Sequence, residues 1–383
     1  MALRFGSAVL VRSGLLHRSN LPAATGVRTR LAFSTVGATA KGGDDAAVQE
    51  ENKAKINAAW NSSAEAYVGN VQDGASSASL KVSSGMNVGY KLATRIVTSP
   101  YDKVQPKEPG KQVVLDVASA GGEPAITIAK ASEGIYRKAM PGATVHATDF
   151  APAMMDLIRK RAAEEGVSNV VASVADGEAL TGFGDESVDA VTCTWGLFFM
   201  LNWQRAIQEF SRVLKRDGVV AVTLWERQEG SVFQRMRNVV ETLVPGFQLL
   251  IDAEALGEDG GSAVVEEMKA AGLYDVSASK FSVPVVLSAD ARPRDIWEHY
   301  TESSPLGQTM STLEKKGRTN VRQEAMDIFE DAMNKEWAEG RTPLGLHKED
   351  DAVAGGSSPA ASRPPRIYYV RALVVVGRKA GGG

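Results

Sequence analysis

The stretch LDVASAGGEPAITIA, residues 115–129, decides the fold of this chain. It runs from an apolar strand carrying Asp116 through a turn of small residues into a helical sequence, whose first turn tolerates Pro124. The turn lacks the G-x-G-x-x-G spacing that holds a pyrophosphate, and a carboxylate beside it would repel phosphate. This stretch therefore predicts a nucleotide-type cofactor site whose ligand has no phosphate.

Strands and helices alternate outward from this stretch. The expected strands are residues 113–117, 144–149, 170–176, 188–196, 219–226, 277–288 and 366–379. The expected helices between the first five strands are residues 123–140, 151–166 and 202–216, and a further helix begins at residue 262. Near-continuous apolar strands that alternate with helices are typical of a parallel sheet covered on both faces. We therefore predict an α/β fold with a doubly wound, mostly parallel, seven-stranded Rossmann-like sheet and an antiparallel last strand.

The remaining segments suggest how the chain is organised around this sheet. We expect residues 1–43 to be an organellar presequence, 44–100 an N-terminal helical lid and 101–288 the core. Residues 289–346 are expected to form a helical insertion over the active site, and 347–365 a flexible loop of low complexity. Residues 366–383 then supply the last core strand and a tail.

Composition excludes several classes of protein and site. The 383 residues are 44% hydrophobic and 23% charged, which is ordinary for a soluble globular protein, and no apolar run is long enough to predict a membrane span. The single cysteine, Cys193, excludes an intrachain disulfide and a cysteine-rich zinc site, and we predict no metal. Without its first 40 residues, which hold five arginines and no acids, the formal charge changes from −3 to −8. Such an acidic body argues against nucleic acid as a partner.

The first 43 residues are basic and contain no acid before Asp44. Arginines recur every six to ten residues over much of this segment, a pattern typical of an organellar presequence and unlike the single basic cluster of a secretory signal. We expect mitochondrial localisation first and plastid localisation second. A disordered tail with no targeting role remains the alternative.

Three acids lie at or next to the carboxyl ends of the expected parallel strands: Asp116, Asp149 and Asp176. Because ligands of such sheets bind beyond the carboxyl ends of the strands, these acids should share one edge. That edge would attract a cofactor that is positively charged and free of phosphate. S-adenosyl-L-methionine, with its ammonium, sulfonium, ribose diol and adenine, fits this description.

The chain resembles the class I S-adenosylmethionine-dependent methyltransferases, in particular the type 11 group that includes the ubiquinone and menaquinone C-methyltransferases. The stretches that carry the resemblance are AAWNSSAEAY, VVLDVASAGGEPAITIA, VHATDFAPAMMDLIRKRA, VADGEAL and VDAVTCTWGLFFMLNWQRAIQEFSRVLKRDGVVAVTLW. Each motif alone is weak, but their order and spacing are specific. The resemblance covers about residues 52 to 287 and resumes at the last strand.

The resemblance assigns the three acids to different parts of the cofactor. It implies that Asp116 anchors the ammonium side, that Asp149 accepts hydrogen bonds from both ribose hydroxyls, and that Asp176 takes the adenine amino group. The other cofactor-binding residues that it implies are Tyr67, Ala118, Ala120, Gly122, Phe150, Gly177 and Trp195. Family members usually have glycine at the position of Ala120 and often at that of Ala118. A methyl group at the closest approach could crowd the cofactor, or be harmless if φ stays negative there.

The sequence indicates the binding site of the methyl acceptor less clearly than that of the cofactor. Methyl transfer needs a base only where the acceptor must lose a proton. His299 and Tyr300, on the inserted helix, are the best candidates for a general base, although packing or surface roles are at least as plausible. The aromatic and apolar residues of the insertion favour a small, partly hydrophobic acceptor: Trp297, Tyr300, Leu306, Met310 and Phe329.

Two functions follow from these observations. The first is an S-adenosylmethionine-dependent methyltransferase acting on a small-molecule acceptor. The most specific form of this hypothesis has a quinone-type ring as the acceptor. The second is a non-catalytic, methyltransferase-like assembly factor or subunit of an organellar complex, in which Ala118 and Ala120 mark decay of the site. The sequence leaves the oligomeric state open.

Overall fold

The computed structural model describes residues 46–69, 80–81, 83–98, 110–133, 140, 142–244, 251–287, 292–302, 305–338 and 366–381. The expected presequence and the expected loop at 347–365 lie outside the described residues. Within the described part of the chain, no helix is long and apolar enough to cross a membrane. The same residues contain no group of three or more His, Cys, Asp or Glu side chains placed to hold a metal ion.

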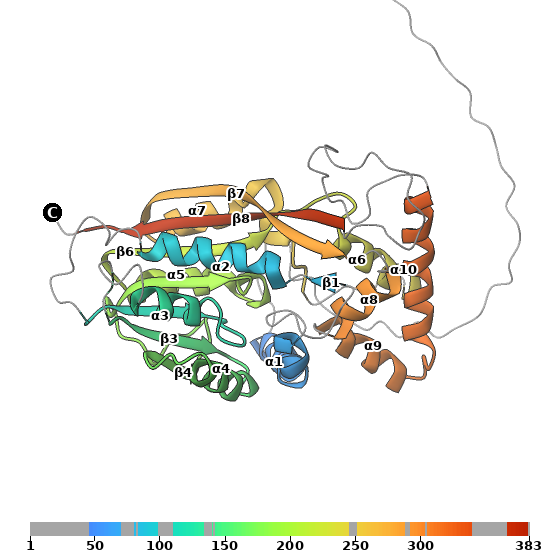
Figure 1. Cartoon of the computed structure of the whole chain (residues 1–383), viewed down its shortest axis with the longest axis horizontal. Coiled ribbons are helices and arrows are strands. Elements are labelled where there is room, and N and C mark those ends of the chain that lie inside the picture. The colour runs from blue at the N-terminus through green and yellow to red at the C-terminus, as the bar shows by residue number, and fades with distance from the viewer. Residues whose placement is uncertain are drawn as a thin grey trace, which may run out of the picture. The chain divides into compact units, whose positions relative to one another are not determined.

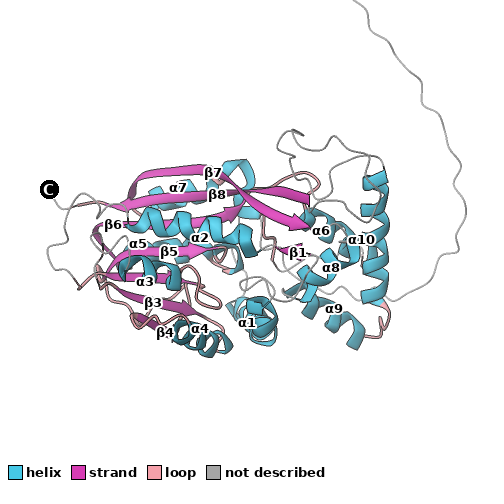
Figure 2. Ribbon diagram, viewed as in Figure 1, coloured by secondary structure: helices cyan, strands magenta, loops and turns pink. Residues whose placement is uncertain are grey.

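A single mixed sheet forms the centre of the fold, with strand order β1-β7-β8-β6-β5-β2-β3-β4 (Figures 1 and 2). Its strands are β1 (Leu80–Lys81), β2 (Val113–Val117), β3 (Thr144–Asp149), β4 (Val170–Val174), β5 (Val188–Thr194), β6 (Leu214–Trp225), β7 (Leu273–Leu287) and β8 (Arg366–Lys379). Strands β4, β3, β2, β5 and β6 are parallel, and β8 is antiparallel to both β6 and β7. The predicted mostly parallel sheet with an antiparallel last strand is confirmed. The two-residue β1, which pairs with β7, was not expected from the sequence.

Helices cover both faces of this sheet. They are α1 (Ala46–Tyr67), α2 (Ser83–Thr98), α3 (Ala125–Glu133), α4 (Ala153–Glu164), α5 (Trp203–Val213), α6 (Val232–Leu243) and α7 (Ser262–Ala270). In Figure 1, α2 and α3 lie in front of the sheet and α5 and α7 behind it. Helix α2 packs on β5, β6 and β7, whereas α5 packs against α7 and β6. The sheet is therefore buried on both faces, as its apolar strands predicted.

Helix α5 shows how the sequence sets these elements. It begins after Asn202, whose side-chain oxygen accepts a hydrogen bond from the Arg205 backbone N–H at 3.0 Å, as expected of an N-cap. Its apolar residues recur at helical spacing and are completely buried: Ala206, Ile207, Phe210 and Val213. The helix therefore places the loop that precedes it firmly against the end of β5.

The expected insertion is helical and consists of α8 (Pro293–Glu302), α9 (Pro305–Lys315) and α10 (Val321–Ala338). These helices pack on one another, and α10 also packs on α6, a helix the sequence analysis did not anticipate. Trp297, Met310 and Phe329 are buried in the hydrophobic core, with exposed fractions of 3%, 0% and 0%. The apolar residues expected to face the acceptor thus include three that pack the core.

Candidate functional site

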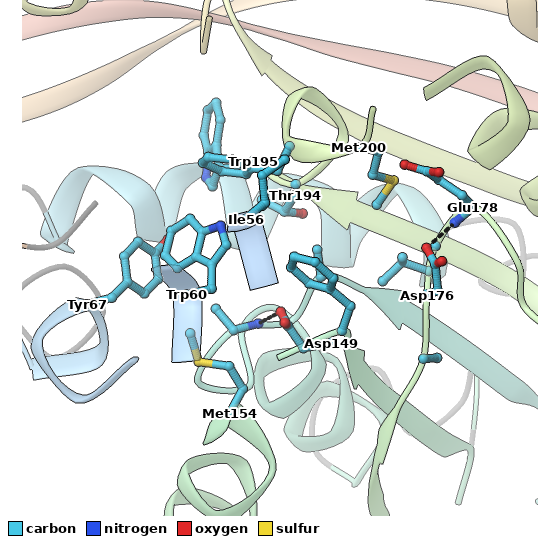
Figure 3. Close-up of a pocket in the computed structure, with 18 of the residues that line it drawn as sticks. Ile56, Trp60, Tyr67, Asp149, Met154, Asp176, Glu178, Thr194, Trp195 and Met200 are labelled. Carbon is cyan, nitrogen blue, oxygen red and sulfur yellow. Dashed lines mark hydrogen bonds between the residues drawn. The ribbon is translucent and has the colours of Figure 1, made fainter. Parts of the chain in front are cut away.

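A pocket lies beyond the carboxyl ends of the parallel strands, between the loops that follow β2, β3, β4 and β5 and the helices α1 and α2 (Figure 3). Its empty space is about 740 Å³, including the part that opens to solvent. This is the position at which ligands bind in open parallel sheets, and the size suits a small-molecule site. In the view of Figure 3, Asp176 and Glu178 lie on one side, and Trp60 and Tyr67 lie on the other.

Asp149 is the acid most firmly fixed in this pocket. It ends β3 and is only 7% exposed. One carboxylate oxygen accepts a hydrogen bond from the Ala120 backbone N–H at 3.0 Å, and the other accepts one from the Ala151 N–H at 2.9 Å. Burial raises the pKa of Asp149 to about 6, although the backbone N–H groups act in the opposite direction. The main chain therefore presents a buried carboxylate to whatever occupies the pocket.

Asp176 and Glu178 form the second acidic element of the pocket. The Glu178 backbone N–H donates to Asp176 Oδ1 at 2.9 Å. The ammonium group of Lys53, on α1, pairs with Asp176 and lies 2.9 Å from Glu178 Oε2. A lysine that the sequence analysis did not single out thus bridges two acids at the pocket wall.

Two further side chains of α1 reach the loop after β3. Asn57 Nδ2 donates to the Phe150 carbonyl oxygen at 2.7 Å, and Asn61 Oδ1 accepts from the Ala153 N–H at 2.9 Å. Together with Lys53, these contacts tie α1 across the edge of the sheet. The expected N-terminal lid therefore has specific polar contacts with the loops it covers.

Asp116 differs from the other two acids because it does not line the pocket. It is fully buried, and its two oxygens accept hydrogen bonds from Ser119 Oγ and Thr192 Oγ1, each at 2.6 Å. Burial raises its pKa to about 7. The structure places Asp116 beneath the turn, where it orders the loop, so the expected contact with the cofactor ammonium gains no support from this geometry.

The turn after β2 corrects a second expectation. Ala118 and Ala120 line the pocket with φ of 58° and 48°, in the left-handed region that favours glycine. Each should therefore be strained by about 1 kcal/mol. Gly122, with φ of 103°, does not line the pocket. A Cβ there would lie 2.8 Å from Ile126 Cδ1, so Gly122 serves the packing of the turn on α3.

A glycine on the opposite loop makes room for one of these alanines. A Cβ on Gly196 would lie 2.5 Å from the Cβ of Ala118 and 3.1 Å from Cys193 Sγ. Gly196 has φ of −107°, which other residues adopt readily, so its requirement for glycine is steric. The loops after β2 and β5 therefore meet at an alanine–glycine contact.

Aromatic side chains form the other end of the pocket. Trp60 on α1 packs edge-on against Tyr67, at a centroid distance of 5.1 Å, and against Phe199, at 4.9 Å. Trp195 stacks on Trp225 at 4.0 Å with an interplanar angle of 15°. Burial, and next the Asp149 carboxylate, raise the pKa of Tyr67, so its hydroxyl stays protonated. This end offers flat apolar surfaces with few charges.

His299 and Tyr300 are not among the residues that line the pocket. His299 is 5% exposed, and burial lowers its pKa to about 4. Tyr300 packs edge-on against Phe233 at 5.7 Å. Among the described residues of the pocket lining there is no histidine. A general-base role for His299 or Tyr300 stays a prediction that their placement does not favour.

Eight of the expected cofactor-binding residues do line this pocket: Tyr67, Ala118, Ala120, Asp149, Phe150, Asp176, Gly177 and Trp195. Sequence reasoning missed Lys53, Tyr90, Thr194 and Phe199, and left Trp60 between packing and lid. Lys53, Trp60 and Tyr67 are seven residues apart, so they recur on one helical face, a signal available in the sequence. Nothing in the local sequence marks Tyr90.

Comparison with known proteins agrees with this architecture. Residues 116–222 match a family described as a methyltransferase domain. The ubiquinone/menaquinone biosynthesis C-methyltransferase UbiE of Zymomonas mobilis is 31% identical over 153 residues, which are 39% of this chain and 58% of that protein. The mitochondrial 2-methoxy-6-polyprenyl-1,4-benzoquinol methylase of Arabidopsis thaliana is 32% identical over 149 residues, 36% of this chain and 51% of that protein.

The chain spans about half the length of the curated relatives that it matches. The matched segment contains the end of β2, all of β3, β4 and β5 and most of β6, together with the residues Asp149, Asp176 and Trp195. Residues 116–222 are thus similar to a methyltransferase domain, and the strand order agrees with the fold that the resemblance implied.

Proposed function

We propose that this chain transfers a methyl group from S-adenosylmethionine to a small, partly apolar acceptor. The observation that carries this proposal is the buried Asp149 carboxylate, which two backbone N–H groups fix at the end of β3 inside the pocket. A carboxylate so placed can accept hydrogen bonds from both hydroxyls of a ribose.

The charges of the pocket fit this cofactor. Four carboxylates and one ammonium group line it: Glu123, Asp149, Asp176, Glu178 and Lys53. An excess of negative charge favours a ligand with ammonium and sulfonium groups and disfavours a phosphate. The residues present therefore fit S-adenosylmethionine better than a dinucleotide.

Each part of the pocket has a role in this proposal. Asp149 would hold the ribose, Asp176 and Gly177 the adenine, and the turn at Ala118 and Ala120 the methionine portion. The bound cofactor supplies an electrophilic methyl group. The chain's own residues align the acceptor in line with it and exclude water, and both effects are strong sources of acceleration for such a displacement. Helix α1, tied to the loops through Lys53 and Asn57, would limit the access of solvent to the pocket.

The names of the relatives favour a particular acceptor and location. The Zymomonas protein is named for ubiquinone and menaquinone biosynthesis, and the Arabidopsis protein is named as a benzoquinol methylase and as mitochondrial. We propose a quinone-type ring as the first acceptor to test and the mitochondrion as the first compartment. Incubation with labelled S-adenosylmethionine and an organelle extract, followed by identification of the labelled product, tests both.

A non-catalytic assembly factor is the competing proposal, and the strained Ala118 and Ala120 are the observation in its favour. Calorimetric titration with S-adenosylmethionine separates the two. The wild-type chain should bind, and Asp149→Ala should weaken binding about 100-fold, because it removes two charge-assisted hydrogen bonds.

A matched control for this titration is Asp185→Ala, whose carboxylate pairs with Arg212 outside the pocket. That variant should bind as the wild type does. A wild-type protein that gives neither binding heat nor a thermal shift with S-adenosylmethionine would favour the assembly factor.

A further inference from the structure

The acid expected to hold the cofactor ammonium, Asp116, does not line the pocket, so that group needs another anchor. The acids that do line the pocket are Glu123, Asp149, Asp176 and Glu178. Asp149 is held by the main chain at the proposed ribose position. Lys53 pairs with both Asp176 and Glu178. Glu123 is the acid of this lining that neither of these arrangements includes.

Glu123 follows directly on the turn proposed for the methionine portion of the cofactor. Ala118 and Ala120 of that turn line the same pocket. The backbone N–H groups of Gly122 and Glu123 both donate to the Ser119 carbonyl oxygen, at 2.8 and 3.2 Å, which closes the turn. The main chain therefore fixes the point from which the Glu123 side chain extends, next to the methionine portion.

The two oxygens of the Glu123 carboxylate have different surroundings. Oε2 accepts hydrogen bonds from Thr127 Oγ1 at 2.7 Å and from the Thr127 backbone N–H at 3.3 Å, and so caps the first turn of α3. Oε1 lies 3.6 Å from Arg161 Nη2, which is too long for a hydrogen bond. One oxygen thus serves the helix, and the other accepts no hydrogen bond from the described residues.

Glu123 Oε1 is also within reach of a ligand. The Glu123 side chain is 11% exposed. The described side-chain atoms that are both enclosed and unpaired include Thr194 Oγ1 and Trp195 Nε1 but not Glu123 Oε1. Since Oε1 has no hydrogen-bond donor, it must retain accessible surface, and the residue to which it belongs lines the pocket.

Arg161 supports this carboxylate without occupying the pocket. Its Nη1 donates to the Gly121 carbonyl oxygen at 2.6 Å, and its Nη2 lies between Glu123 and Glu165, at 3.6 and 3.7 Å. Burial raises the pKa of Glu123, whereas the Thr127 hydrogen bonds and the Arg161 charge favour the ionised form. Because Arg161 does not line the pocket, a second cation can approach Glu123 from the pocket side.

A primary ammonium group suits Glu123 Oε1. It has three N–H donors, so it can bind one carboxylate oxygen in a charge-assisted hydrogen bond and still donate to carbonyl oxygens nearby. A sulfonium has no N–H group and would gain only the attraction between the charges. A carboxylate or phosphate would be repelled. The chemistry of this oxygen therefore matches one part of the cofactor.

We propose that Glu123, in place of Asp116, binds the ammonium group of the cofactor's methionine portion through Oε1. This inference rests on the proposed methyltransferase function and adds to it the residue that recognises the amino group. Asp116 then acts within the fold alone, beneath the turn.

Two ligands that differ only in this amino group test the proposal: S-adenosylhomocysteine and its deaminated analogue, in which hydrogen replaces the amine. Calorimetric titration of the full chain measures both affinities. The wild type should bind S-adenosylhomocysteine more tightly by about tenfold, as expected for a charge-assisted hydrogen bond. Glu123→Gln should remove most of this preference and leave the affinity for the deaminated analogue nearly unchanged, because the amide oxygen can still cap α3.

Glu165→Gln is the matched control, since it removes a carboxylate from the other side of Arg161, outside the pocket. This variant should keep the wild-type preference for the amino group. Asp116→Asn should keep it too, because a change beneath the turn affects both ligands alike.

An undiminished preference in Glu123→Gln, an equal loss of affinity for both ligands in that variant, or a preference lost in Asp116→Asn would overturn the inference. Equal affinity of the wild type for the two ligands would overturn it as well. Failure of the proposed function is seen separately, as a wild-type protein that binds neither ligand.

Discussion

The two ends of the pocket differ in how their polar groups are satisfied. At the acidic end, Asp149 and Asp176 accept hydrogen bonds from backbone N–H groups, and Lys53 pairs with Asp176. At the aromatic end, Thr194 Oγ1 and Trp195 Nε1 have no partner among the described residues. The main chain therefore satisfies the acids at one end, whereas two buried polar atoms at the other end stay unpaired.

This difference matches the different demands of donor and acceptor. A carboxylate held by the main chain is preorganised and needs no rearrangement when a ribose arrives, which reduces the entropic cost of binding. The flat aromatic surfaces at the other end favour a planar, partly apolar ligand. The acidic end should thus govern affinity for the cofactor, and the aromatic end should govern choice of acceptor.

The largest expected effect is on the stability of the fold, at the contact between the loops that follow β2 and β5. Gly196→Ala would bring its Cβ within 2.5 Å of the Ala118 Cβ, and should lower the free energy of unfolding by about 2–3 kcal/mol through overpacking. Chemical denaturation of the variant measures this change.

Ala118→Gly is combined with Gly196→Ala as a test, because it removes the Cβ that the new alanine side chain would contact. The double variant should recover most of the lost stability, and Ala118→Gly alone should be close to neutral, because relief of the left-handed strain offsets the added freedom of the unfolded chain. If the double variant is as unstable as Gly196→Ala, the contact between the two loops is not the cause.

The next largest effect is the pH dependence of S-adenosylmethionine binding at the acidic end. The pKa of Asp149 is raised to about 6, chiefly by burial, and the proposed ribose contacts need the ionised form. Affinity for S-adenosylmethionine should therefore be nearly constant above about pH 7, be about halved at pH 6 and be about tenfold lower at pH 5. Calorimetric titrations across this range measure the profile.

Protonation of Asp149 does not unfold the protein, so unfolding caused by this group cannot explain a loss of cofactor affinity at low pH. Because the folded state holds the Asp149 proton more tightly than the unfolded state, this group makes the fold more stable as pH falls from about 6 towards 3.8. Asp149→Asn should bind weakly with no inflection near pH 6. An inflection that persists in this variant would assign the titration to another group.

The smallest effect concerns the link between α1 and the acidic end. Lys53→Met removes the ammonium group that bridges Asp176 and Glu178 and should speed dissociation of the cofactor about fivefold, since partly exposed ion pairs contribute up to about 1 kcal/mol. Stopped-flow displacement measures the rate. Lys55→Met, whose ammonium group pairs with Glu51 within the same helix, should leave the rate unchanged. Equal acceleration in both variants would mean that the lid is not tied at Lys53.

The sequence predicted the fold well because the fold depends on regular patterns. Strands β2, β3 and β8 have the predicted bounds, since apolar runs between turn residues specify where a buried strand begins and ends. The two-residue β1 carries little pattern of its own, whereas α6 was overlooked although Ser231 caps it and Val232, Met236 and Val240 recur at helical spacing. Tertiary pairing, rather than local sequence, creates β1.

The site was predictable in part, for a physical reason. Position at a strand end identified Asp149 and Asp176 but did not distinguish them from Asp116. The difference is that the hydroxyls of Ser119 and Thr192 bind the Asp116 carboxylate beneath the turn, and those contacts depend on the folded structure. Positive φ at Ala118 and Ala120 does not meet the condition under which their methyl groups would be harmless, and backbone angles of this kind cannot be read from the sequence. Thr194 was not identified because an unsatisfied hydroxyl is a property of its surroundings and not of its sequence.

The most direct test of this account is a crystal structure of the protein grown with S-adenosylhomocysteine. We predict the ribose hydroxyls within hydrogen-bond distance of the Asp149 carboxylate, and the sulfur directed towards the aromatic end at Thr194 and Trp195. A ligand that lies elsewhere, or an Asp149 carboxylate that still contacts only the backbone while the ribose faces another residue, would contradict the account.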